Sequence, residues 1–184
     1  METATVVLIV VAVLVLGAFA FWYIQRRRSK LLRERFGPEY ERTVAGSGNR
    51  RKAEQVLESR QKRVARYQIR PLAPGDRDRF AESWHDVQSQ FVDDPNGAVA
   101  RADQLVGDVL HLRGYPVTDF WQRAEDISVD HPVVVENYRA AHDIAVRRKR
   151  GEASTEDLRQ AMVYYRTLFE ELLGAGETVH TEVK

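Results

Sequence analysis

The chain has 184 residues, and its 28 Lys or Arg nearly balance its 27 Asp or Glu, giving a formal net charge of +1. It contains no cysteine, which excludes thiol catalysis and disulfide bonds. It also shows neither a glycine-rich phosphate loop nor a nucleophile elbow, so these common enzyme signatures are absent.

The first segment is an uncharged run from Thr3 to Ile24. A helix needs about 20 apolar residues to cross the hydrocarbon core of a bilayer. The run therefore predicts a transmembrane anchor over residues 1–25. Aromatic and basic side chains at its end are typical of a membrane interface. The residues expected there are Trp22, Tyr23, Arg26, Arg27, Arg28, Lys30 and Arg33.

Charge predicts the orientation of this anchor. Met1 and Glu2 precede the run without any positive charge, whereas the basic residues follow it. The positive-inside rule then predicts a single-pass protein of the inner (plasma) membrane, with its N-terminus outside and its C-terminal module in the cytoplasm. The alternative is a cleaved signal peptide on an exported protein, because Ala18-Phe19-Ala20 resembles a cleavage site.

Charge is distributed unevenly beyond the run. Residues 26–70 carry 15 Lys or Arg and 5 Asp or Glu, whereas residues 71–184 carry 13 and 21. Anionic lipids attract basic residues near a membrane surface. We therefore expect a basic, helical juxtamembrane neck over residues 26–70 whose partner is the membrane, through its anionic lipid headgroups.

Helix breakers divide this neck. The segment 26–36 can continue the first helix, and Gly37-Pro38 should end it, since proline lacks an N–H group. A short helix is predicted over 39–45 and a basic helix over 50–67, with a flexible turn over 46–49.

From Asp76 onward the apolar spacing is helical throughout, which predicts a helical bundle over 71–174 and a polar tail over 175–184. Asp94 and Ser154 are predicted N-caps, the second in a capping box with Asp157. Thr118 is the predicted cap of a short helix. The predicted fold class is all-α, with an N-terminal transmembrane helix, basic juxtamembrane helices and a small helical bundle.

Two side-chain hypotheses concern this bundle. Trp84 and Trp121 fall at helical core spacing, which favours core packing over a ligand pocket. The turn at Tyr115-Pro116 and the predicted helix start at Asp130-His131-Pro132 flank the same short helix, so we expect them to lie close together or, alternatively, to serve only as separate turns and caps.

The five histidines are the remaining candidates for chemistry. His85-Asp86 and His142-Asp143 are dipeptides of the kind found in metal-dependent HD phosphohydrolases, and His131 lies eleven residues before His142. Such an enzyme would bring several histidines and carboxylates into one pocket, and scattered histidines would contradict it. Because the dipeptides alone are weak signals, no catalytic, cofactor-binding or metal-binding residue is assigned, and no cofactor is expected.

Several short strings are distinctive. They are Arg35–Val44, Phe91–Pro95, Arg113–Pro116, Val129–Pro132, Glu136–Arg139 and Ser154–Arg159. Together they resemble an uncharacterised bacterial family of small single-span membrane proteins, often labelled hypothetical or secreted. The resemblance implies a bacterial source and an anchor followed by helices, but no activity.

The sequence therefore predicts a membrane-tethered cytoplasmic helical binding or scaffolding module rather than an enzyme. Its further partner would be an unidentified protein or a second copy of the chain. Nucleic acid is not the expected partner, because Tyr67 is the one aromatic residue in the basic segment 50–70.

Overall fold

The computed structural model describes residues 2–174, and it describes side-chain surroundings from residue 14 onward. That part of the chain forms eight α-helices and no strand, which confirms the all-α class. The chain divides into two compact units, Met1–Leu57 (unit 1) and Glu58–Lys184 (unit 2). The predicted polar tail, with His180, lies outside the described residues.

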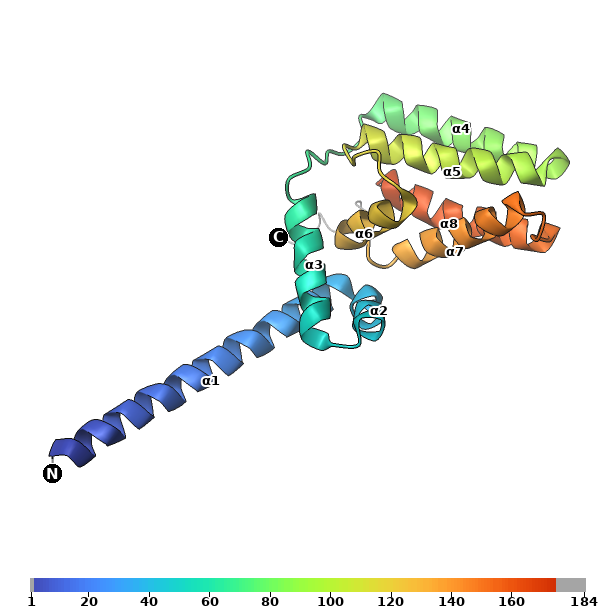
Figure 1. Cartoon of the computed structure of the whole chain (residues 1–184). Helices are drawn as coiled ribbons and strands as arrows, with labels where there is room; N and C mark the ends of the chain where they lie inside the picture. Colours follow the sequence, from blue (N-terminus) through green and yellow to red (C-terminus); the bar gives the residue numbers. More distant parts are fainter. Residues whose placement is uncertain (1, 175–184) are drawn as a thin grey trace. The chain divides into compact units, whose positions relative to one another are not determined.

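Unit 1 contains α1 (Glu2–Phe36), α2 (Pro38–Ser47) and the first part of α3 (Arg50–Val64), as Figure 1 shows. The break predicted at Gly37-Pro38 is confirmed. Gly37 adopts a φ of 47°, a left-handed conformation that glycine tolerates, and Pro38 is the first residue of α2. The expected short helix and basic helix both form, each close to the predicted bounds.

The predicted transmembrane anchor is not supported. Among the helices of the described residues, none combines the length and the apolar content that crossing a bilayer requires. α1 continues without a break into the basic segment up to Phe36. The predicted localisation, single-pass in the bacterial inner membrane with the C-terminal module in the cytoplasm, is therefore wrong.

Unit 1 has a small core at the junction of its helices. Phe36 is fully buried, and Tyr40 and Leu32 are nearly so. Ala53 and Leu57 of α3 are also fully buried, as their spacing on one helix face predicts. This core is short of apolar residues, so the polar contacts described below carry part of its stability.

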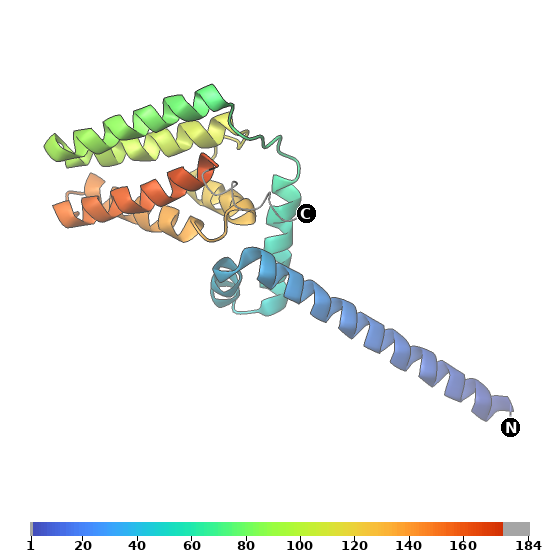
Figure 2. The same ribbon diagram turned by 180° about the vertical axis from the view of Figure 1, so that it is seen from behind.

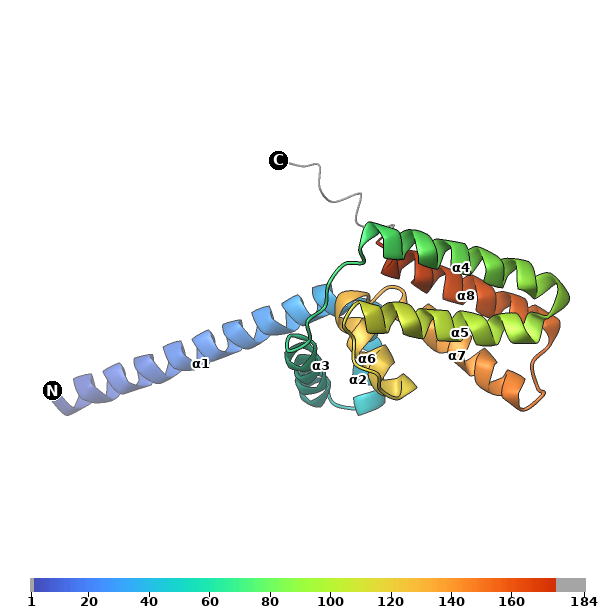
Figure 3. The same ribbon diagram turned by 90° about the horizontal axis from the view of Figure 1, so that it is seen from above.

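Unit 2 is a helical bundle, which confirms that part of the fold prediction. Its helices after the end of α3 are α4 (Pro74–Asp93), α5 (Pro95–Leu112), α6 (Phe120–Asp130), α7 (Val135–Lys149) and α8 (Thr155–Leu172). α5 packs on α4, α7 and α8, while α7 packs on α8 and on the short α6. The pairing of α4 with α5 is clear from behind in Figure 2, and Figure 3 shows α8 from above beside the other long helices.

The core of unit 2 is continuous across these helices. The apolar face predicted for the last helix is buried, with Tyr165 and Leu168 fully inaccessible. Trp84 of α4 is buried and stacks on Phe169 of α8 with ring centroids 4.9 Å apart, as core spacing predicts. Trp121 is different: it is 65% exposed, so its predicted core packing is wrong. Its neighbour Phe120 takes the partly buried position instead.

Local signals fixed most helix starts. The Asp94 side chain caps α5, and Ser154 forms the predicted capping box with Asp157 at the start of α8. The cap of α6 is Asp119 rather than Thr118, because the carboxylate accepts from two amides of the first turn. His131 closes α6, so the helix predicted to start at Asp130 begins later, at Val135.

Two polar contacts fasten the loops and ends of unit 2. The Tyr115 hydroxyl donates to Asp130 at 2.9 Å, which confirms that these two connections lie together. Asp126 has a side chain only 2% exposed, and it accepts from Arg63 at 2.7 Å and from Tyr67 at 3.0 Å. The second contact holds the end of α3 and the following turn against α6.

Candidate functional site

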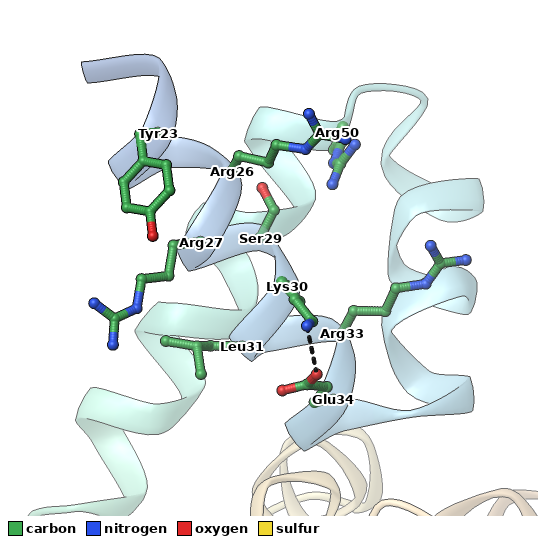
Figure 4. A pocket seen from close by; sticks show the side chains of 9 residues that line it. All are labelled: Tyr23, Arg26, Arg27, Ser29, Lys30, Leu31, Arg33, Glu34 and Arg50. Atoms are coloured by element: carbon green, nitrogen blue, oxygen red, sulfur yellow. Dashed lines mark ion pairs between the residues drawn. The ribbon is translucent and has the colours of Figure 1, made fainter. Parts of the chain in front are cut away.

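The strongest candidate site is a cleft of about 670 Å³ in unit 1, between the basic part of α1 and the start of α3. Figure 4 shows the side chains of Arg26 and Arg50 reaching from these two helices toward the same opening. We call it the cationic cleft. Its lining residues are Tyr23, Arg26, Arg27, Ser29, Lys30, Leu31, Arg33, Glu34 and Arg50.

Charge in the cleft is strongly positive. Five of its lining side chains are cationic and one, Glu34, is a carboxylate. Glu34 lies 3.8 Å from Lys30, and both are well exposed, so their interaction is weak and solvent-screened. Arg33 forms a closer ion pair of 2.7 Å with Glu41 of α2. The positive charge of the cleft is therefore only partly compensated by its own walls.

Arg50 is held in place from behind the cleft by buried groups. Its Nε donates to Glu54 at 3.0 Å and to the Tyr40 hydroxyl at 2.9 Å. The Glu54 carboxylate is only 5% exposed and also accepts from Tyr40, at 2.8 Å, and from Ser29. Burial alone would raise the pKa of Glu54, but the hydrogen bonds from Ser29, Tyr40 and Arg50 together lower it. The ionised Glu54 carboxylate thus holds Arg50, one of the cations that line the cleft, in position.

Arg26 and Arg27 supply the charge that remains available. The Arg26 guanidinium lies 5.0 Å from the centre of the Trp22 ring, a cation–π contact that orients it without neutralising it. Among the residues that the structure describes, neither arginine forms an ion pair with a carboxylate. A guanidinium presents paired N–H donors that match the oxygens of a carboxylate or phosphate. These two side chains are therefore the expected anion ligands.

Most residues predicted for the membrane interface meet at this cleft. Tyr23, Arg26, Arg27, Lys30 and Arg33 line it, and Trp22 supports one of them. Arg28 does not line it.

Sequence reasoning missed three further residues of unit 1. Arg50 is a wall of the cleft, and Ser29 and Glu54 form its buried support. Ser29 and Glu54 come together only because α2 and α3 fold back on α1. No spacing rule along one helix could have paired them.

The histidines do not form a second site. His131 Nδ1 lies 3.0 Å from Glu171, whereas the His142 ring stacks on Phe120 with centroids 3.4 Å apart. His85 and His111 are exposed on the surfaces of α4 and α5. Within residues 2–174 no three His, Cys, Asp or Glu side chains gather as a metal site requires. The convergence that an HD-type enzyme needs is therefore not found in this part of the chain.

No known family, curated protein or solved structure matches this chain. The resemblance to a family of single-span proteins stays a prediction.

Proposed function

We propose that the protein is a helical binding or scaffolding module that holds the anionic groups of a partner in the cationic cleft of unit 1. The observation that carries the proposal is the pair Arg26 and Arg27, which lines a cleft of about 670 Å³ and has no carboxylate partner among the residues that the structure describes. A ligand that brought phosphate or carboxylate oxygens would supply the missing countercharge.

The groups of the cleft favour binding over catalysis. Ser29 is the one small hydroxyl side chain that lines it, but that hydroxyl already donates to Glu54. Glu54 is a poor general base, because its three donors lower its pKa and stabilise the carboxylate. We therefore assign Glu54 to positioning Arg50.

The anionic partner can be tested with a soluble probe. Inositol hexakisphosphate carries many phosphate groups and no apolar surface, and uncharged inositol is its reference. Calorimetry on the full chain should detect binding of the phosphate compound alone. Arg26→Gln combined with Arg27→Gln should weaken it by about tenfold or more, since two charge-assisted contacts are lost.

A matched variant separates the cleft from net charge. Arg159 and Arg166 of α8 are also exposed, and in the described part of the chain they form ion pairs with Glu156 and Glu170 of the same helix. Arg159→Gln with Arg166→Gln removes the same charge and should leave the affinity within about twofold. Equal losses in both double variants, or no loss in the first, would show that the cleft is not the binding site.

A further inference from the structure

One helix of unit 1 exposes a long apolar surface next to the cationic cleft. From Leu14 to Ile24 of α1, the large apolar side chains are 51–67% exposed. They are Leu14, Val15, Leu16, Phe19, Phe21, Trp22, Tyr23 and Ile24. Contiguous apolar surface of this kind is uncommon on a protein without a binding partner.

The cleft and the apolar surface adjoin directly. Tyr23 belongs to both, because it is part of the apolar stretch and also lines the cleft. Trp22 is exposed, and the Arg26 guanidinium lies over its ring in a cation–π contact. Apolar side chains, aromatic rings and cations thus follow one another along a single helix at about 1.5 Å per residue.

We infer that the cleft binds the phosphate headgroup of an anionic phospholipid, whose acyl chains contact the exposed apolar residues of α1. This inference rests on the proposed function and names its ligand. The headgroup phosphate would lie against Arg26, Arg27 and Lys30, where the lining groups are cationic. The acyl chains would cover Leu16, Phe19 and their exposed neighbours.

An anionic amphiphile fits both the cationic cleft and the exposed apolar residues of α1, whereas other anions fit the cleft alone. A soluble phosphate ester would occupy the cleft and leave the apolar stretch in water. An acidic protein segment would need apolar side chains of its own at the matching place. Trp22 and Tyr23 lie between the apolar stretch and the cleft. Their rings suit the boundary between headgroup and acyl chain, where one end of the ring is hydrated and the other is not. The contact uses only the surface of α1 and requires no helix that crosses a bilayer.

The inference can be tested by flotation of the full chain with vesicles. Vesicles containing phosphatidylglycerol should carry the protein upward, whereas pure phosphatidylcholine vesicles should carry much less. Leu16→Asn with Phe19→Asn should weaken the flotation by about tenfold or more, because apolar contact is lost. The same variant should keep its affinity for inositol hexakisphosphate, because this probe has no apolar surface and would bind only in the cleft.

A matched control uses exposed apolar residues of unit 2. Val117 and Val133 are 76% and 74% exposed. Val117→Asn with Val133→Asn should leave both flotation and hexakisphosphate binding unchanged. Circular dichroism checks that each variant keeps its helix content.

The outcomes distinguish the two proposals. Loss of hexakisphosphate binding in Arg26→Gln/Arg27→Gln supports the cleft, whatever the vesicles show. Flotation that is insensitive to Leu16→Asn/Phe19→Asn, and fully displaced by hexakisphosphate, would assign the cleft to soluble phosphate compounds and overturn the lipid inference. Equal flotation with neutral and anionic vesicles would overturn the headgroup contact.

Discussion

The exposed apolar residues of unit 1 are contiguous along one helix, whereas those of unit 2 are scattered over several helices and loops. In unit 2 they are Val92, Val117, Trp121, Val133 and Val163. Scattered apolar residues are normal on a protein surface and need no partner.

The two units also differ inside. Unit 2 buries a continuous apolar core drawn from α4 to α8, and its buried Asp126 is paired with Arg63. Unit 1 buries few apolar side chains and relies on the hydrogen bonds around Glu54. The comparison teaches that unit 2 buries its apolar faces against one another, whereas unit 1 leaves a contiguous apolar stretch and the cations of the cleft exposed.

The largest expected effect tests the core of unit 2. Phe169→Ala removes a side chain that is 2% exposed and stacked on Trp84, so it should lower the free energy of unfolding by about 3–5 kcal/mol. Val163→Ala on the same helix removes a half-exposed side chain and should cost under about 1 kcal/mol. Urea denaturation measures both, and similar losses would show that the core is less continuous than described.

The next effect tests whether unit 1 depends on its polar support. Glu54→Gln removes an ionised acceptor of three donors and should destabilise unit 1 by about 1–3 kcal/mol. Native-state hydrogen exchange should speed up in α2 and the start of α3, while α5 and α8 stay protected. Glu34→Gln is the control, because that carboxylate is 61% exposed. Faster exchange throughout unit 2 would contradict a role of Glu54 that is confined to unit 1.

A smaller effect tests the cap of α8. Ser154→Ala removes the acceptor for the Asp157 amide and should cost about 1 kcal/mol in unfolding free energy. Ser83→Ala is the comparison, because that hydroxyl donates to a carbonyl within α4 and caps nothing. Thermal unfolding should separate the two variants, and an equal change in melting temperature would argue against the capping box.

The smallest effect is a pH dependence in unit 2. Burial against Phe120 lowers the pKa of His142 below its ordinary value of 6.5. As the pH falls below 6.5, the unfolded chain therefore binds a proton more readily than the folded one, and stability decreases. His142→Phe keeps a ring in the stack and removes the proton site. Melting temperatures followed from neutral to mildly acidic pH should fall less in this variant than in the original chain, and parallel curves would exclude His142 as the source.

Much of the helix pattern could be predicted from the sequence, since its signals are local. A capping box joins residues three positions apart, as at Ser154 and Asp157, and the adjacent Gly37 and Pro38 break a helix. Burial was harder to predict. Trp84 and Trp121 share helical spacing, but α6 is short and turns Trp121 toward solvent, so only the first reaches the core.

By itself the sequence determined that the chain is helical, where the helices of unit 1 break, and that positive charge follows the apolar run. These properties depend on backbone preferences and composition. Only the tertiary structure decided that Glu54 meets Ser29 behind a cleft, because this contact joins residues that are more than six helical turns apart in sequence. It also decided that Arg26 and Arg27 line this cleft and, within the described part of the chain, have no carboxylate partner, since ion pairing depends on which helices fold back and where their acidic residues lie.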